Sequence, residues 1–452
     1  MQRFHEGKSA VVSACKQWLA YPPHALLIII IAGFAFPLDL GAHLGLSLPL
    51  SLLDVLIPLV LLCLLPQLHI PKAFTWLLLC SAFALVSIAV HAWSHPIGYR
   101  PLYSWGYFFK VYLAYVLGYN LLCDRSRFKV FLTAIVVANT VLVLLIYTTI
   151  PMAEWRGQLA VLGLSIFATN GINGFAGYIS CVAMIAWGLA FDAERKHRYG
   201  YVAAAAIMSV LPYAVGSRQA VLASILFLIP FVLRYPKRLG VMIALSLAIA
   251  GLAYSVAYHA SQQVAPGAQP VRPKNPVDHV VVSMNYKMHH SLFFMRTGNW
   301  DRLTAGRLNL YRAALGEWSH AKLWGRGFQG FSEQQSPQLL KLYKQLTGVS
   351  PHNQYLGALW KMGAVGFVFY MVFLVKVGVS FYQTYRQNVW LSRPLTWMAV
   401  ICFGMFMMLQ DFLTQPLTGC FFLIVAGGVQ RLLDTPATDK VKLTSERVRR
   451  EA

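Results

Sequence analysis

A Pro-His-Asn tripeptide at positions 351–353 lies where a long polar stretch ends and a long apolar run begins. Gly363 and Gly366 follow within the apolar run. In an ideal helix, which turns about 100° per residue, these glycines lie about 20° and about 40° from His352, on either side of it. The spacing therefore predicts one stripe of one helix that carries a titratable imidazole and two positions with bare backbone.

The start of this predicted helix determines the chemistry of the imidazole. We expect Ser350 to cap the helix and Pro351 to be its first residue, so that His352 lies in the first turn. The helix dipole there disfavours imidazolium, and a neutral imidazole accepts a proton. The free N–H groups of the same turn favour an anion nearby. We interpret the pattern as the catalytic end of a membrane enzyme.

Two arginines are candidates to hold an anionic substrate. Arg218 opens another apolar run and should lie in the first turn of its helix, with Leu222 packing one turn below. Arg307 should project from the apolar face of a helix predicted over 301–318, where a guanidinium needs an anionic partner or a polar cavity. Arg312 points away from that face. The alternatives are an ordinary interfacial arginine at 218 and a snorkelling arginine at 307.

Three other features have a functional and a structural interpretation. The stretch 325–330, GRGFQG, follows a helix and not a strand, so we expect a glycine-rich turn and no dinucleotide site. No cysteine or carboxylate accompanies the histidines within 279–290 as a ligand cluster, and no Asp-x-Asp occurs, so we expect neither a metal nor a cofactor. Lys110, Asp54 and Asp411 lie in or beside apolar runs and are functional candidates or members of a buried ion pair.

The composition places these residues in a membrane protein. Of 452 residues, 57% are hydrophobic and 12% are charged, and the mean hydropathy is +0.55, which excludes an ordinary soluble domain. The formal charge of +22 is dispersed between apolar runs, so it indicates loops at a membrane surface and no nucleic-acid partner. Most of the seven cysteines lie in or beside predicted spans, so we expect no disulfide framework.

About twelve apolar runs have the length of a membrane span. Basic residues cluster in alternate loops, which places both chain ends in the cytoplasm. The first run follows a polar stretch without a cleavage site, so we expect a retained span and not a signal peptide. The predicted spans lie at 23–40, 48–66, 72–93, 102–123, 128–150, 172–192, 199–215, 217–235, 238–258, 353–382, 394–412 and 415–432.

This topology divides the chain into four parts. Residues 1–258 hold the spans before one large loop, which covers residues 259–352, lies outside the cytoplasm and contains helices. Residues 353–432 hold the spans after it, and residues 433–452 form a basic cytoplasmic tail. A basic loop above a bilayer suits a phosphorylated, lipid-linked substrate, or alternatively adhesion to anionic headgroups. The predicted fold is an all-α polytopic integral membrane protein.

The two arginine and histidine motifs resemble those of the O-antigen ligase and polymerase superfamily. Ligases of that family carry an R-x3-L motif, which Arg218 and Leu222 match. They also carry an H-[NSQ]-x9-G-x-x-G motif, which the stretch from His352 to Gly366 matches. Each motif is short, and their order along the chain makes the set specific.

Two further elements are similar to the same superfamily. Its Gly-Arg helix followed by a glycine-rich turn looks like Gly306-Arg307 and the stretch 325–330. Its Asn-x-x-Asn-Gly-Phe-Ala element looks like the stretch with Asn170 and Asn173, before the sixth predicted span. The resemblance covers about residues 150–370 with motifs.

The resemblance implies a GT-C-like integral-membrane glycosyltransferase. It would move a glycan from undecaprenyl diphosphate onto the lipid A-core, at the periplasmic face of the inner membrane of a Gram-negative bacterium. His352 would be the general base, and Arg218 and Arg307 would bind the diphosphate, with Asn353 and Arg312 as further substrate-binding candidates. Direct attack would invert the anomeric carbon without a metal. The leucine, glycines and asparagines of the motifs would be structural.

Three rival functions stay open. An O-antigen polymerase and a protein O-oligosaccharyltransferase belong to the same superfamily as the ligase. A transporter of lipid-linked glycan is the rival from another class, and it should carry charges near the bilayer midplane and often paired repeats. The candidate residues instead cluster at one membrane face, which favours surface chemistry.

Overall fold

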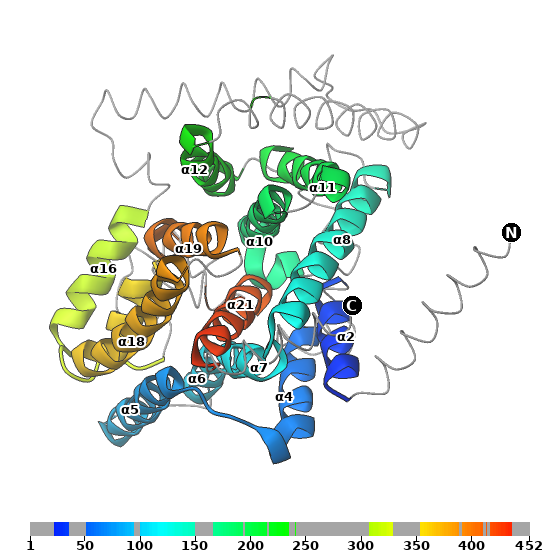
Figure 1. The fold of residues 1–452 in the computed structure, drawn as a ribbon. Helices are drawn as coiled ribbons and strands as arrows, with labels where there is room; N and C mark the ends of the chain where they lie inside the picture. The colour runs from blue at the N-terminus through cyan, green and yellow to red at the C-terminus, as the bar shows by residue number, and fades with distance from the viewer. Residues whose placement is uncertain are drawn as a thin grey trace, which may run out of the picture.

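The structure is a computed structural model that consists of helices joined by turns, with no strand among the residues it describes (Figure 1). The all-helical prediction is therefore confirmed for this part of the chain. The described residues are 22–35, 51–94, 100–149, 166–192, 195–214, 217–234, 240, 307–328, 353–387, 391–409, 413 and 416–435.

Every predicted apolar run except 238–258, of which only residue 240 is described, falls on one or two of the helices. The helices are α2 (Pro22–Ala35), α4 (Leu52–Leu64) with a 3₁₀ turn η1 (Leu65–Gln67), α5 (Lys72–Ser94), α6 (Arg100–Lys110), α7 (Leu113–Leu121), α8 (Arg125–Thr149), α10 (Ile166–Asp192), α11 (Arg195–Ala214), α12 (Arg218–Arg234), α16 (Arg307–Ser319), α18 (Gln354–Arg386), α19 (Ser392–Ile401) with a π-helical turn η3 (Cys402–Phe406), α20 (Met407–Leu409) and α21 (Pro416–Asp434).

Six of the described helices are long and apolar enough to cross a membrane. Shorter apolar helices at Ala25–Phe34 and Leu52–Gln67 accompany them. The chain is therefore a multi-pass membrane protein, and the total of about twelve spans stays a prediction.

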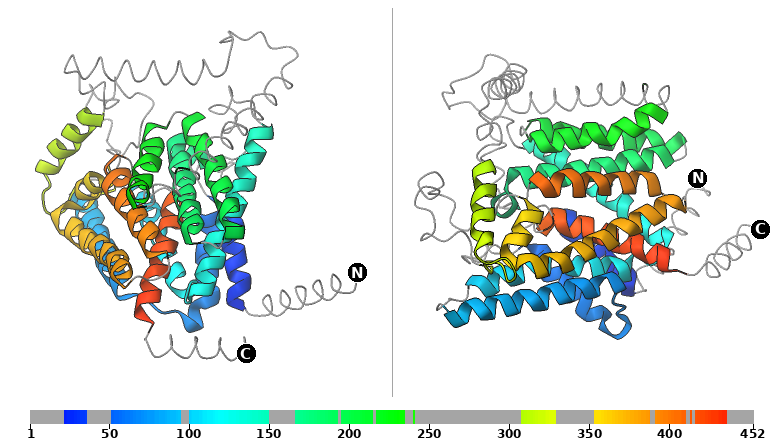
Figure 2. Two further views of the ribbon diagram at one scale, coloured as in Figure 1. Left: turned by 45° about the horizontal axis from the view of Figure 1, so that its top comes forward. Right: turned by 90° about the vertical axis from the view of Figure 1, so that its left-hand side faces the viewer.

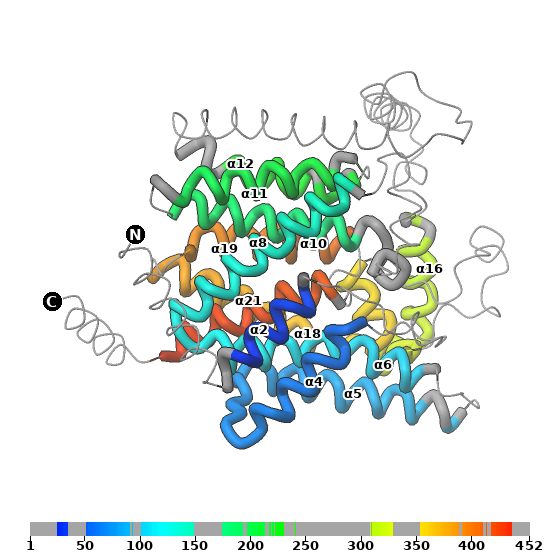
Figure 3. The backbone as a smooth tube through the Cα atoms, turned by 90° about the vertical axis from the view of Figure 1, so that its right-hand side faces the viewer, coloured from blue at the N-terminus to red at the C-terminus, as the bar shows by residue number. Residues whose placement is uncertain are grey.

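Most helices lie side by side with roughly parallel axes, whereas α16 lies across one end of the bundle (Figures 2 and 3). Helices α10 and α21 run through the middle (Figure 1). All side chains from Gly174 to Ala190 in α10 are buried, as expected for a helix that is apolar all round and has protein on every side.

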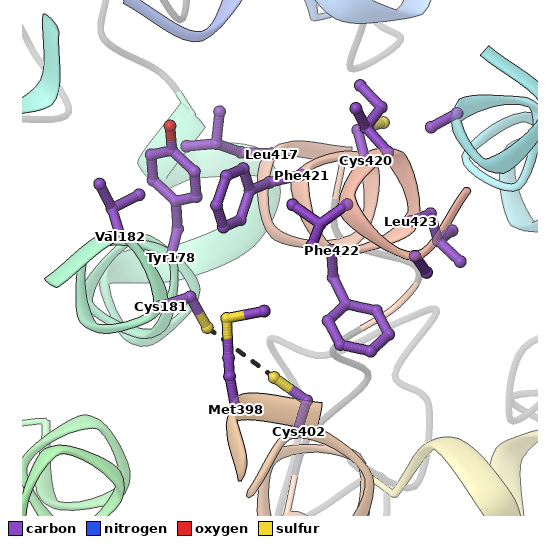
Figure 4. Packing of buried hydrophobic residues seen from close by; sticks show 14 of the residues in the cluster. Tyr178, Cys181, Val182, Met398, Cys402, Leu417, Cys420, Phe421, Phe422 and Leu423 are labelled. Carbon is purple, nitrogen blue, oxygen red and sulfur yellow. Dashed lines mark hydrogen bonds between the residues drawn. The ribbon is translucent and has the colours of Figure 1, made fainter. Parts of the chain in front are cut away.

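Aromatic and small residues pack the centre of the bundle. Tyr178 of α10 meets Phe421 of α21 edge to face, with ring centroids 5.5 Å apart (Figure 4). Three residues after Tyr178, Cys181 of α10 faces Cys402 of η3 with a sulfur–sulfur distance of 3.9 Å. A Cβ added to Gly118 of α7 would lie 2.1 Å from the Ile424 carbonyl oxygen, so glycine there lets α7 and α21 approach closely.

The fourth predicted span, 102–123, is not one helix. A turn at Val111 and Tyr112 separates α6 from α7. At the end of α6, the Lys110 ammonium lies 2.7 Å from the Asp54 carboxylate in the first turn of α4. The ion-pair interpretation of these two charges is therefore confirmed, whereas Asp411 lies outside the described residues.

Basic residues stand at several helix ends on one side of the bundle. The starts of α8 and α11 and the ends of α12 and α18 lie together at the end opposite α16 (Figure 3). Those helix ends carry Arg125, Arg195, Arg234 and Arg386. The predicted topology would place this end on the cytoplasmic side and α16 on the outer side, which stays a prediction.

Candidate active site

Helix α18 begins three residues later than its sequence indicates. Asn353 is the N-cap, with an extended backbone, and its side-chain oxygen accepts a hydrogen bond from the Leu356 N–H at 3.0 Å. The prediction that Ser350 caps the helix and His352 lies in its first turn is therefore wrong. Asparagine caps a helix as well as serine does, so the helix starts after the Pro-His pair. His352 itself lies outside the described residues and immediately precedes the cap in the sequence.

Helix α18 bends sharply at Gly363, whose φ of 65° and ψ of −173° are not helical. The side chain of Gln354 nevertheless lies beside the Tyr370 hydroxyl. Sixteen residues of straight helix would separate these residues by about 24 Å, so the first segment of α18 (354–362) must fold back toward the second (364–386). The prediction of a single helical stripe from His352 to Gly366 is wrong for this reason.

A turn at residues 320–328, here called the glycine turn, fills the break in α18. The Ala364 N–H donates to the Lys322 carbonyl at 2.8 Å, and the Arg326 N–H donates to the Trp360 carbonyl at 2.8 Å. The Gly327 N–H donates to the Lys361 carbonyl at 3.0 Å. These bonds replace helical bonds that the bend removes.

Glycines on both sides make this junction possible. Gly325 and Gly327 have φ of 71° and 74°, which confirms the predicted glycine-rich turn. A Cβ on Gly363 would lie 2.2 Å from the Leu323 carbonyl oxygen and 2.4 Å from the Gly325 nitrogen. Gly366 is also buried, and a Cβ there would lie 2.5 Å from the Met362 Cβ. The glycine motif therefore builds a bend and its contact with the glycine turn.

Helix α16 carries the second arginine motif. Arg307 is its first residue, and nothing beyond the backbone of Arg307 is described. Leu310 and Ala314 are buried, as the predicted apolar face requires, whereas Arg312 is exposed, as expected of a residue that points away from that face. Its role as a substrate-binding residue stays a prediction.

A hydrogen bond that the sequence did not reveal joins α16 to α18. The Trp360 indole N–H donates to the Glu317 carboxylate at 2.8 Å. Burial raises the pKa of Glu317 above its ordinary value, while this hydrogen bond and the charge of Arg326 oppose the rise. The one available signal was an acidic residue within a strongly basic stretch.

The remaining motif residues begin α12 and α10. Arg218 is the first residue of α12, and its side chain lies outside the described part of the structure. Leu222 is 46% exposed, so the prediction that it packs against protein is wrong. Asn170 and Asn173 lie in the first turns of α10, which begins before the predicted span, and only their backbone is described.

The structure thus brings the elements of these motifs to one end of the bundle. Helix α16, the glycine turn and the bend of α18 form one contiguous unit there, and α12 begins at the same end (Figures 2 and 3). Among the described residues no three His, Cys, Asp or Glu side chains are grouped to hold a metal ion. The histidines within 279–290 lie outside these residues.

Part of the chain matches a known protein family. Residues 203–371, from α11 to the second segment of α18, match the protein-family model described as O-antigen ligase. The matched region contains the Arg218, Arg307 and His352 motifs. Among curated proteins, no sequence matches the chain.

Proposed function

The chain carries an O-antigen ligase-type domain at residues 203–371, and from this premise we propose that it is an O-antigen ligase. It transfers the glycan of an undecaprenyl diphosphate donor to the lipid A-core oligosaccharide, at the periplasmic face of a Gram-negative inner membrane. The reaction completes lipopolysaccharide.

One arrangement carries this proposal. The starts of α12 and α18 and the whole of α16 lie at the end of the bundle opposite the starts of α8 and α11 (Figure 3). The residues proposed to act on substrate therefore belong to one membrane face. A lipid-linked donor presents its diphosphate at that depth, because its polyprenyl chain remains in the bilayer. A transporter would instead need its charges near the midplane.

The proposed residues have complementary roles. Arg218 and Arg307 bind the diphosphate through bidentate hydrogen bonds and stabilise the charge that grows on it. The first turn of α18 adds N–H groups and the positive end of a helix dipole beside Asn353. His352 accepts the proton of the acceptor hydroxyl while the hydroxyl oxygen attacks the anomeric carbon. The bond from that carbon to the diphosphate breaks, and its electron pair leaves with undecaprenyl diphosphate, which inverts the anomeric carbon.

A reconstitution assay tests the proposal. Purified protein receives lipid-linked glycan together with lipid A-core, a Ser/Thr-rich acceptor peptide, or no acceptor. We expect glycan on the lipid A-core only. Longer lipid-linked glycan without acceptor would indicate a polymerase, and glycan on the peptide would indicate a protein glycosyltransferase. Movement of intact donor across vesicles without any transfer would indicate a transporter.

A further inference from the structure

Three helices of the proposed site donate hydrogen bonds to one short segment, residues 402–409, which comprises η3 and α20. The Tyr355 hydroxyl of α18 donates to the Phe403 carbonyl at 2.7 Å. The Tyr311 hydroxyl of α16 donates to the Met408 carbonyl at 3.1 Å. The Gln219 side-chain amide of α12 donates to the Leu409 carbonyl at 3.3 Å. We call this segment the hub.

Each donor is a close neighbour of a residue proposed to act on substrate. Gln219 directly follows Arg218 in the first turn of α12. Tyr311 lies four residues after Arg307, on the same face of α16. Tyr355 lies in the first turn of α18, two residues after its cap. The three motif-bearing turns are thus tied to the same few carbonyl groups.

The backbone of the hub suits this role. The carbonyl groups of Met408 and Leu409, in the short helix α20, accept two of the three hydrogen bonds. The preceding turn is π-helical, a geometry that occurs often at functional sites. Cys402 and Phe406 of the π-helical turn are buried, which anchors the hub in the bundle.

We infer that the hub positions the three parts of the active site, and that Gln219, Tyr311 and Tyr355 are positioning residues. This inference rests on the proposed function. None of the three side chains is required to touch the substrate. Each fixes where its neighbouring turn, and therefore the adjacent arginine or cap, lies relative to the other two. A displacement of about 1 Å in such an arrangement lowers turnover by about 100-fold.

Tyrosine-to-phenylalanine variants test the hub with little loss of packing. Tyr311→Phe and Tyr355→Phe each remove one hydroxyl donor. Tyr382→Phe and Tyr385→Phe are matched controls, because both tyrosines lie exposed on the second segment of α18. We expect turnover per folded molecule to fall about 10- to 100-fold in the hub variants, with donor KM changed less than kcat. The controls should stay within about twofold of the wild type.

A second variant with its control tests the hydrogen bond from α12 to the hub. Gln219→Met removes the amide donor at similar side-chain length, and Gln383→Met is its control at an exposed position of α18. The same loss of turnover is expected for Gln219→Met only.

A double-mutant cycle separates positioning from a general structural role. If Tyr311 acts through Arg307, Tyr311→Phe should cost much less in the Arg307→Lys background than in the wild type. Equal costs in both backgrounds would overturn the role assigned to Tyr311. Lower folded yield with normal turnover per folded molecule would likewise reduce all three residues to structural contacts.

Hydrogen exchange distinguishes failure of the hub from failure of the proposed function. Backbone amides of residues 308–312 and 355–358 should exchange faster in the hub variants than in the Tyr382→Phe control, without any substrate. If the wild type transfers glycan to no acceptor, the proposed function fails and exchange alone tests the hub. Unchanged exchange in both Tyr311→Phe and Tyr355→Phe would refute the hub whatever the activity.

Discussion

The substitution Gly363→Ala tests the bend on which the geometry of the candidate site depends. At φ 65° and ψ −173°, Gly363 has a backbone conformation that is essentially restricted to glycine. The added methyl group would also lie 2.2 Å from the Leu323 carbonyl oxygen, a backbone atom that cannot rotate away. Alanine therefore either displaces the glycine turn or straightens α18.

The cost of Gly363→Ala in folding free energy has two parts, backbone strain and lost hydrogen bonds. The strained conformation costs a non-glycine residue about 1–3 kcal/mol. Displacing the glycine turn breaks the three backbone hydrogen bonds to Trp360, Lys361 and Ala364, which contribute about 0.5–1.5 kcal/mol each. Because the methyl group would clash with backbone atoms, we expect displacement of the glycine turn to dominate. The expected loss of unfolding free energy is about 2–5 kcal/mol.

A second glycine-to-alanine change in the same region is the control. Gly316 lies on α16, and a Cβ there meets nothing within 4 Å. Gly316→Ala should be neutral or stabilising by up to about 1 kcal/mol, because alanine favours a helix. Unfolding of both variants in detergent, followed by tryptophan fluorescence or by resistance to denaturant, gives the comparison. Equal stability of Gly363→Ala and Gly316→Ala would refute the bend.

Four further outcomes follow from the site. His352→Ala should fold and still bind donor, and its turnover should fall about 10²- to 10⁴-fold in the transfer assay. Arg307→Lys should impair transfer because lysine lacks the bidentate fork, whereas Arg312→Lys, at an exposed position of the same helix, should be mild. Transfer should survive EDTA, and its abolition with rescue by magnesium or manganese would contradict a metal-independent reaction. The raised pKa of Glu317 means that its ionisation weakens the folded state as pH rises from the ordinary value of 4.5 through the raised one. Glu317→Gln should remove that part of the pH dependence of unfolding and retain an acceptor for Trp360.

Hydrophobic run length predicted where helices lie but not where they break. The runs at 102–123 and 353–382 have no local feature that separates them from continuous spans. In the structure each is interrupted by a partner distant in sequence. The α6 end meets Asp54 of α4, and Gly363 meets the glycine turn. Local patterns cannot show such breaks, because the cause of each is a tertiary contact.

The candidate site shows the same limit on a smaller scale. The sequence placed Arg218 at a helix start, and the structure agrees. Arg307 was expected in the middle of a helix over 301–318 and is the first described residue of α16, and Asn353 was expected inside the first turn and is the cap. The cap and the bend were mispredicted because several capping residues stand together at 350–353 and because helical spacing was extended through a glycine. Some side chains join two helices by a hydrogen bond, as Tyr355 does, but in the sequence they look like any aromatic residue near a membrane surface. Only their partners distinguish them.

The bend also gives the spacing of the histidine motif a different meaning. Nine residues separate Asn353 from Gly363, and they form the whole first segment of α18. Gly363 is held against Gly325, which fixes one end of this segment. The length of the segment therefore determines where Asn353, at its other end, lies beside the second segment. That distance places Gln354 beside Tyr370 and Tyr355 beside the Phe403 carbonyl. Inserting or deleting one residue in the segment would rotate the cap by about 100° and move it by about 1.5 Å, which would break both contacts. The fixed spacing is therefore explained by a distance from the bend to the cap, and not by a shared helical face.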